Sequence, residues 1–421
     1  MLSRHLTLSA TQLTALMMSL LSQLMMARHV GPGRALDLYF ATTGFAAAAV
    51  GGIVVASTYL VPAHVRSALD RSASPGDGAD AARDCLLAML SCGALLSVLA
   101  IVAYGVVGIP HANGASASWW LLLICSWLAA LLSIAVAGAS GIGAAHGVVA
   151  LPMVLGMLPP GLIVAYLALA GTPDVGELAL AQSSGVAIQA IGLGVLLRGR
   201  WHVRHPHWPS IRSLIKLVPL AALGAVCFSG YAAVDALLAP RIGEGVLSHQ
   251  AMAQRLVIAF GSVASAGPFM LAPSRMATLL TAGDRDAAWS YGLRAVLGLT
   301  AVMAFAAAMT QPVGRWLIKL LFEHGTFGSR DTVAVSQIVQ ILLLGAGPML
   351  GTAVLFRILH GLHRPKYVAA ASLAFLAAYG ACAALLAEPL GPDALATAYS
   401  LAWVGTLILT LGLVRVSLRS L

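Results

Sequence analysis

The sequence predicts an all-α integral membrane protein that crosses the bilayer about twelve times, in two halves of about six helices each. Of the 421 residues, 59% are hydrophobic and only 9% are charged, whereas roughly a quarter of the residues of a soluble domain are charged. Long apolar segments recur along the whole chain, and one short pattern occurs twice, about half a chain apart. Composition and repetition together therefore indicate a polytopic membrane protein with two related halves.

Each expected span is a mainly apolar stretch of about 20 residues, the length that crosses the hydrocarbon core. The spans of the first half are 7–27, 38–62, 84–108, 118–138, 147–171 and 178–198, and those of the second half are 213–238, 247–272, 288–311, 331–357, 366–387 and 394–416. An even number in each half gives both halves the same orientation in the membrane. We therefore expect an N-terminal lobe over 1–200, a cytoplasmic linker over 201–212 and a C-terminal lobe over 213–421.

The repeated pattern lies at the start of each half. The matching residues are Ala27, Val30, Gly31 and Gly33 in the first copy and Ala239, Ile242, Gly243 and Gly245 in the second. Each half is expected to open with the same helix–turn–helix. The second copy continues into a polar run that ends in the charged Arg255, within a segment that is otherwise apolar.

Basic residues predict the orientation of the chain. One set of loops and ends carries Arg4, Arg66, Arg71, Arg83, Arg198, Arg200, Arg204, Arg212, Lys216, Arg275, Arg285, Arg364, Lys366 and Arg419. The alternate loops carry Arg28, Arg34, Arg241, Arg315, Lys319 and Arg330. The positive-inside bias places the richer set, with both termini, in the cytoplasm. Since the net charge of +9 lies in short loops without a basic, aromatic-rich patch, we expect no nucleic-acid partner.

Catalytic and metal-binding motifs are missing from the sequence. It contains no HExxH, GxSxG, P-loop or paired catalytic carboxylates, and its five cysteines lie in or beside apolar segments without a CxxC. We expect no enzyme activity, no cofactor and no metal. The linker histidines His202, His205 and His207 invite a metal site, but a basic interfacial linker anchored by tryptophans is the favoured interpretation.

The candidate functional residues are polar side chains at membrane depth, which usually face a cavity or a pathway. They are Gln23, Arg28, Asp37 and Gln189 in the first half, and Asp235, Gln250, Gln254 and Arg255 in the second. Arg255 lies about 15 Å along its helix from Gly245, deeper than snorkelling readily covers. A guanidinium there suits a phosphate or diphosphate. A structural ion pair with Asp235 or Asp37 is the alternative, and the two roles can coexist.

Two other segments have distinctive patterns. In 314–327, Trp316, Leu317, Leu320 and Leu321 share one helical face, which predicts a short amphipathic helix in the outer interface. Gly325 is expected to end this helix, and Ser329 to cap the next span. Prolines and glycines interrupt the fifth span between 152 and 161, which favours a hinge and a packing kink equally.

Several segments together resemble a known family. LIKLLFEHGTFGSRDT (317–332) is similar to a family pattern L-L-F-E-R-G-x-F, and ARHVGPGRALDLYFA (27–41) to A-R-x-x-G-x-x-x-x-x-D. VDALLA (234–239), AQRL (253–256), AHGVVA (145–150) and RILHGLHRP (357–365) fit further family segments. The chain thus resembles the MurJ/MviN lipid II flippases of the multidrug/oligosaccharidyl-lipid/polysaccharide exporter superfamily. The resemblance implies two lobes around a central cavity, alternating between inward-open and outward-open states in the bacterial inner membrane.

The resemblance also implies a cargo and site residues. The cargo would be an undecaprenyl-diphosphate-linked saccharide, such as the lipid II peptidoglycan precursor, moved to the outer leaflet. Arg28 and Arg255 match family arginines that hold the diphosphate, and Asp37 and Asp235 match family acids. For such a cargo, our own hypothesis is that Gln189, Gln250 and Gln254 offer hydrogen bonds to the sugar. Membrane lipids are further partners, with H⁺ or Na⁺ coupling or the membrane potential driving transport.

The chain departs from the family pattern at several points. Ser22 and Gln23 stand where the family has Arg-Glu, Gly44 aligns with a family arginine, and two C-terminal helices of the family have no counterpart among the expected spans. Another lipid-linked polysaccharide unit, of an O-antigen, capsule or exopolysaccharide, is therefore an alternative cargo. A cation-coupled multidrug exporter and a non-transporting scaffold are alternative functions.

Overall fold

The computed structural model describes residues 2–71, 75–107, 117–171, 173–198, 208–362 and 364–419, and its secondary structure over these ranges is helical, without a strand. Contacts divide the chain into two compact units. Unit 1 comprises Met1–Val30 and Leu38–Ala233, and unit 2 comprises Gly31–Asp37 and Val234–Leu421. Within the described ranges, nine helical segments are long and apolar enough to cross a membrane, or ten with one bent pair. The prediction of an all-α membrane protein is confirmed.

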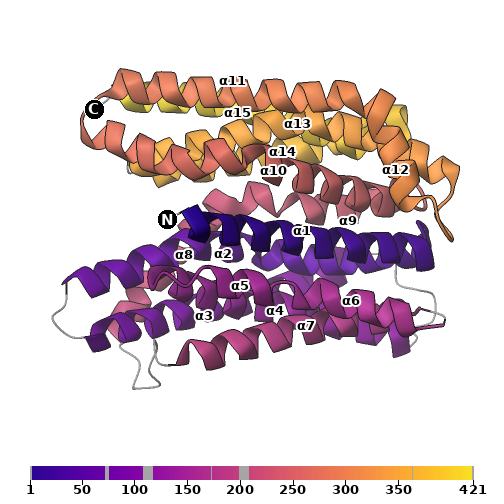
Figure 1. Cartoon of the computed structure of the whole chain (residues 1–421), viewed down its shortest axis with the longest axis horizontal. Coiled ribbons are helices and arrows are strands. Elements are labelled where there is room, and N and C mark those ends of the chain that lie inside the picture. Colours follow the sequence, from indigo (N-terminus) through magenta and orange to yellow (C-terminus); the bar gives the residue numbers. More distant parts are fainter. Residues whose placement is uncertain are drawn as a thin grey trace. The chain divides into compact units, whose positions relative to one another are not determined.

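Each expected span coincides with one helix or with two consecutive helices (Figure 1). The helices of the first six spans are α1 (Leu2–His29), α2 (Arg34–Arg71), α3 (Pro75–Val107), α4 (Ala117–Ala145), α5 (Ala150–Leu155) with α6 (Leu158–Leu169), and α7 (Val175–Leu196). Those of the second six are α8 (Trp208–Ala225) with α9 (Tyr231–Ile242), α10 (Val246–Thr281), α11 (Arg285–Met309), α13 (Ser329–Gly361), α14 (Pro365–Leu390) and α15 (Ala394–Arg419). Hydropathy therefore locates the helices of this chain well.

Two of the spans are broken helices. The fifth is interrupted between α5 and α6 at Gly156, and there the start of α6 packs tightly on α7, because a Cβ on Gly185 would lie 2.4 Å from Cα of Pro159. This contact gives the break a packing role; the hinge interpretation stays a prediction. The seventh span bends by 45° between Leu214–Phe228 and Tyr231–Ile242, which the expected continuous helix over 213–238 did not anticipate.

Close packing explains why α8 belongs to unit 1. A Cβ on Gly52 of α2 would lie 2.6 Å from the carbonyl oxygen of Ala222, and the Tyr59 hydroxyl donates a hydrogen bond to the Ala221 carbonyl at 3.1 Å. Small residues let two helix backbones approach in this way in membrane proteins. The contact boundary falls after Ala233, and the expected lobes 1–200 and 213–421 with their linker 201–212 stay a prediction. The linker histidines His202, His205 and His207 lie outside the described residues.

Helix α13 is the centre of unit 2. It packs against α10, α11, α12 and α15, and it runs beside α11 and α15 in Figure 1. Glycines permit the approach: a Cβ on Gly345 would lie 2.6 Å from Cα of Ser400 on α15, and one on Gly347 would lie 2.8 Å from Cα of Thr300 on α11. These glycines of α13 therefore let the backbones of α11 and α15 approach it closely.

The amphipathic segment forms the expected short helix, α12 (Arg315–Phe322). Trp316, Leu317, Leu320 and Leu321 are exposed, whereas Ile318 and Phe322 are buried. The helix already ends at Phe322, with Glu323 as its C-cap, although Gly325 does adopt the left-handed conformation, with φ of +68°. The expected Ser329 cap is wrong: Ser329 is the first residue of α13, and Gly328 occupies the cap position.

The two glycine turns of the repeat differ in their backbone. Gly31, between α1 and α2, has φ of +75°, and Gly245, between α9 and α10, has φ of +82°. Gly31 is the first glycine of its copy, whereas Gly245 is the second. Both values lie in the region that glycine adopts without steric cost. The two halves therefore share a sequence motif and a helix–turn–helix, but not the position of the left-handed residue.

Candidate functional site

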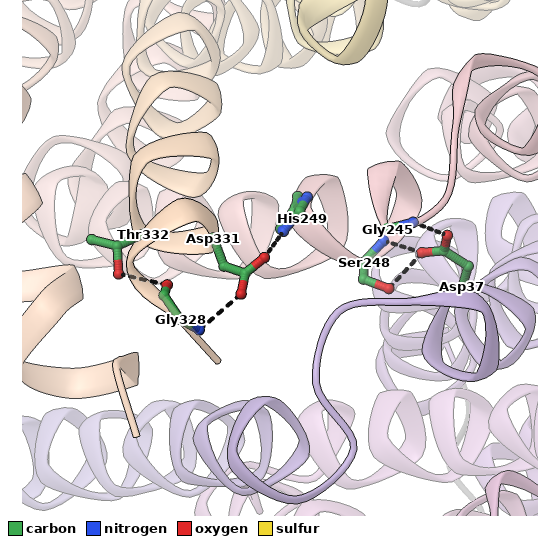
Figure 2. A network of polar contacts seen from close by, with 7 residues as sticks. All are labelled: Asp37, Gly245, Ser248, His249, Gly328, Asp331 and Thr332. Carbon is green, nitrogen blue, oxygen red and sulfur yellow. Dashed lines mark hydrogen bonds and ion pairs between the residues drawn. The ribbon is translucent and has the colours of Figure 1, made fainter. Parts of the chain in front are cut away.

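The start of α10 is capped by the carboxylate of Asp37 (Figure 2). One oxygen accepts the Gly245 N–H at 2.6 Å, and the other accepts the Ser248 N–H at 2.7 Å and the Ser248 hydroxyl at 2.5 Å. The first amides of a helix lack intrahelical partners and carry its positive dipole end. Asp37 therefore satisfies α10 from a distant segment, and both belong to unit 2.

The polar network continues from α10 to α13. Nε2 of His249 lies 2.8 Å from Oδ1 of Asp331, and the other oxygen of Asp331 accepts the Gly328 N–H at 2.8 Å (Figure 2). The Thr332 hydroxyl, one residue further, donates to Glu323 at 2.9 Å. Asp331 thus caps its own helix and joins it to the first turn of α10. This network joins the starts of α10 and α13, and the carboxylates of Asp37 and Asp331 both have hydrogen-bond partners within it.

Asp235, on α9, lies in a different surrounding. It is 2% exposed, and it accepts hydrogen bonds from Nε2 of Gln254 at 3.1 Å and from the Tyr379 hydroxyl of α14. Tyr379 stacks with Phe375, which packs on Trp403 with ring centroids 4.2 Å apart. The sequence placed Asp235 and Gln254 among the candidates, and the structure joins them. Their carboxylate site is built from side chains and is bordered by an aromatic cluster.

Arg255 follows Gln254 on α10, and its side chain is exposed. It makes no hydrogen bond or ion pair with any residue that the structure describes. The expected alternative of a structural ion pair finds no support within unit 2, because Asp37 and Asp235 both have other partners. As the tenth residue of α10, Arg255 lies about 14 Å from the start of the helix.

The amide side chains among the candidates are mostly buried. Both polar atoms of Gln250, at 1% exposure, and Oε1 of Gln23 have no hydrogen-bond partner among the described residues. Gln189 is buried beside the α5–α6 break, where a Cβ on Gly156 would lie 3.6 Å from its Nε2. Buried polar atoms without protein partners are costly, so these amides stay candidates for contact with the cargo. Arg28 is exposed at the end of α1.

The two positions that align with arginines of the family pattern, Ser22 and Gly44, are occupied by small residues. The Ser22 hydroxyl donates back to the Ser19 carbonyl at 2.8 Å, within α1. Gly44 of α2 is close to Ala232, whose Cβ would lie 3.7 Å from a Cβ added at Gly44. Neither position supplies a charge, so the cationic candidates that remain are Arg28 and Arg255.

Sequence reasoning missed three residues of these networks. Ser248 has no distinctive sequence pattern, because a serine is common near the start of a helix. Asp331 was interpreted only as part of the start of its own helix. Tyr379 could have been predicted from the sequence, because it lies in the middle of an apolar span, where a buried tyrosine hydroxyl needs a hydrogen-bond partner. No group of three His, Cys, Asp or Glu residues suited to a metal ion occurs in the part of the chain that the structure describes.

Comparison with known proteins agrees with this architecture. The family model "Lipid II flippase MurJ" matches residues 161–419, more than half of the chain. A solved structure of lipid II flippase MurJ in an inward closed conformation superposes with a TM-score of 0.76 at 14% identity, covering 97% of this chain and 87% of that one.

Two structures of a multidrug resistance MATE family transporter of the MOP superfamily also have a similar fold. An inward-facing structure gives a TM-score of 0.67 at 14% identity, covering 97% of this chain and 95% of that one. An outward-facing structure gives 0.61 at 16% identity, covering 99% and 95%. No curated protein sequence matches the chain. The matched residues 161–419 run from α6 to α15. The chain therefore belongs to the MurJ family of membrane flippases, as its sequence motifs predicted, and not to a class of enzymes.

Proposed function

We propose that the protein moves an undecaprenyl-diphosphate-linked saccharide, of the lipid II type, from the inner to the outer leaflet of a bacterial inner membrane. The proposed mechanism is alternating access, with the lobes 1–200 and 213–421 moving against each other about the linker 201–212. Both termini are cytoplasmic in this proposal, as the distribution of basic loop residues favours. Family membership and the fold support it.

The observation that carries the proposal is the state of Arg255. A guanidinium one-third of the way along a membrane-length helix is expensive to keep unless it meets an anion. Among the described residues Arg255 has no such partner, although two carboxylates, Asp37 and Asp235, lie within the same unit. The planar guanidinium can form two parallel hydrogen bonds to a phosphate. Arg255 is therefore the proposed ligand of the diphosphate, with Arg28 as the second.

The amides are proposed to contact the sugar. Gln250 and Gln254 lie one turn apart on α10, and Gln254 directly precedes Arg255. Both polar atoms of Gln250 lack a partner in the described structure. An amide offers a donor and an acceptor, the two groups that a sugar hydroxyl pairs with. Gln189 and Gln23 carry the same chemistry on α7 and α1 of unit 1.

The two acids are proposed to have different duties. Asp37 positions α10, and with it Arg255, through the cap on the first turn. Asp235 is the proposed coupling group for H⁺ or Na⁺, because its partners are side chains that can rearrange. The membrane potential would add about 2.3 kcal/mol per charge per 100 mV to the export of an anion.

A second candidate is cation-coupled export of drugs, which the structural match to MATE transporters and the buried Asp235 favour. Another lipid-linked polysaccharide unit is a third, because Ser22 and Gly44 replace charges of the family pattern. Drug susceptibility of a deletion strain separates the second candidate from the first. Identification of the polyprenyl lipid that copurifies with the protein separates the third.

The test of the site is Arg255→Ala in a strain depleted of its own lipid II flippase. We expect this variant to lose complementation and Arg255→Lys to keep a small part of it, since lysine preserves the charge but not the two parallel hydrogen bonds. Arg294→Ala is the matched control: Arg294 is also an exposed tenth residue of a spanning helix in unit 2, but its Nε donates to the Ser290 carbonyl at 3.2 Å. Normal growth with Arg255→Ala at wild-type membrane levels would remove the site assignment.

A further inference from the structure

A charged cavity of about 500 Å³ lies at one end of unit 2, away from the polar networks of the helix starts. It is lined by Asp284, Arg285, Asp286 and Trp289 from the start of α11 and by Arg415 and Arg419 from the end of α15. These residues define the α11–α15 pocket. Its volume lies within the range of about 300 to 1,000 Å³ that is typical of small-ligand sites.

Local structure builds the α11–α15 pocket. Gly283, with φ of +76°, turns the chain between α10 and α11, and the Asp284 carboxylate caps α11 by accepting the Ala287 N–H at 3.0 Å. This cap fixes Arg285 in the first turn of α11. Arg415 and Arg419 are four residues apart, so they lie on the same face of α15. Three guanidiniums thus converge from two helices on one cavity.

The arginines of the pocket are not neutralised by their neighbours. In the described ranges, the side chains of Arg285, Arg415 and Arg419 make no hydrogen bond or ion pair, although Asp284 and Asp286 line the same cavity. The Asp284 carboxylate is already used by the helix cap. The lining therefore keeps a positive surplus and many unused N–H donors, an arrangement that suits a phosphate group.

The position of the pocket indicates the source of the phosphate. The pocket lies where two apolar spans, Arg285–Phe322 and Pro365–Arg419, have their charged ends. Trp289 is half-buried there, and tryptophan prefers the level of the lipid headgroups. Arg285 and Arg419 belong to the residues that the positive-inside bias puts on the cytoplasmic side.

We propose that the α11–α15 pocket binds the phosphate of an anionic phospholipid headgroup in the cytoplasmic leaflet. Arg415 and Arg419 hold the phosphate, Arg285 completes the charge, and Trp289 borders the glycerol region of the lipid. A free phosphate ion has the same recognition chemistry, so the test includes it. The site is independent of Arg255 and of the cargo proposed above, since it involves none of those residues.

The test measures lipid binding to the purified full-length chain by native mass spectrometry, with phosphatidylglycerol and phosphatidylethanolamine as the lipids. We expect tighter binding of phosphatidylglycerol, and about a tenfold or greater loss in Arg415→Gln/Arg419→Gln, because two charge-assisted contacts are removed. Arg285→Gln should show a smaller loss. Thermal unfolding in detergent establishes that each variant is folded.

The matched control is Arg212→Gln/Lys216→Gln, which removes two exposed charges with the same spacing from α8, outside the pocket. We expect it to change phosphatidylglycerol binding by less than about twofold. Inorganic phosphate that competes at the concentration of the lipid would assign the pocket to the soluble ion; absence of competition would assign it to the lipid. An equal loss in the pocket variant and the control, or no preference for phosphatidylglycerol in the unchanged protein, would overturn the proposal.

Discussion

Two carboxylates that look alike in the sequence, Asp37 and Asp235, have opposite surroundings in the structure. Asp37 accepts hydrogen bonds from main-chain amides and a serine at the start of α10. Asp235 is buried and accepts from the side chains of Gln254 and Tyr379. Main-chain donors at a helix start are fixed by the fold, whereas side-chain donors can turn away. This difference is the basis of our proposal that Asp37 maintains the architecture and that Asp235 takes part in the transport cycle.

The largest expected effect is that of Asp235→Asn on transport. The variant keeps the size of the side chain and can still accept one hydrogen bond, but it cannot exchange a cation. We expect at least a tenfold loss of flippase activity, equivalent to about 1.4 kcal/mol or more, with little change in thermal unfolding. Measurement of lipid translocation in proteoliposomes tests this. Full activity of the folded variant would make Asp235 a structural acid like Asp37.

Asp37→Ala should act mainly on stability. It removes the acceptor of three hydrogen bonds at the start of α10, and loss of a helix N-cap costs up to about 2 kcal/mol. The reduction should appear as a lower unfolding temperature in detergent, with transport per folded molecule retained. Ser329→Ala is the control, because Ser329 resembles a cap in the sequence but is the first residue of α13. A stable but inactive Asp37→Ala would give Asp37 a direct role in transport.

The two glycines of the first repeat turn, Gly31 and Gly33, should respond differently to alanine. Gly31→Ala is expected to cost about 1–2 kcal/mol, because φ is +75° and the new Cβ would lie 2.7 Å from Oγ1 of Thr326. Gly33→Ala should be close to neutral, since φ is not positive and the nearest atom, of Glu244, is 3.6 Å away. Unfolding in detergent measures both. Similar losses at the two positions would contradict the backbone assigned to this turn.

Among the changes expected to lower stability, His249→Ala should have the smallest effect. The side chain is 15% exposed, and its contact with Asp331 is one of two that Asp331 makes. Loss of a single partly buried hydrogen bond costs about 1 kcal/mol, so unfolding should shift less than in Asp37→Ala. Asp331→Ala should cost more than His249→Ala, because it also removes the cap of α13. A larger loss of stability in His249→Ala than in Asp331→Ala would mean that the histidine contributes more to the network than the aspartate does.

Much of the architecture was predictable because hydropathy is a local property. Each expected span coincides with helical segments, and the amphipathic pattern before Gly325 gives α12. The bend between α8 and α9 was not predictable, since it interrupts an apolar stretch that reads as one helix. The site was predicted in part: Asp235 and Gln254 were chosen for their polarity at membrane depth, while Tyr379, on α14, was not.

The sequence by itself determined that this chain is a helical membrane protein of the MurJ family, because apolar spans, loop charges and short motifs are all properties of neighbouring residues. Only the tertiary structure decided what each polar residue does. Asp37 and Ser248 are 211 positions apart, and Tyr379 and Asp235 are 144 apart. No local pattern encodes such pairings, since they depend on which helices pack together. The charge of Arg255 was visible in the sequence; that it keeps no protein partner in the described structure was not.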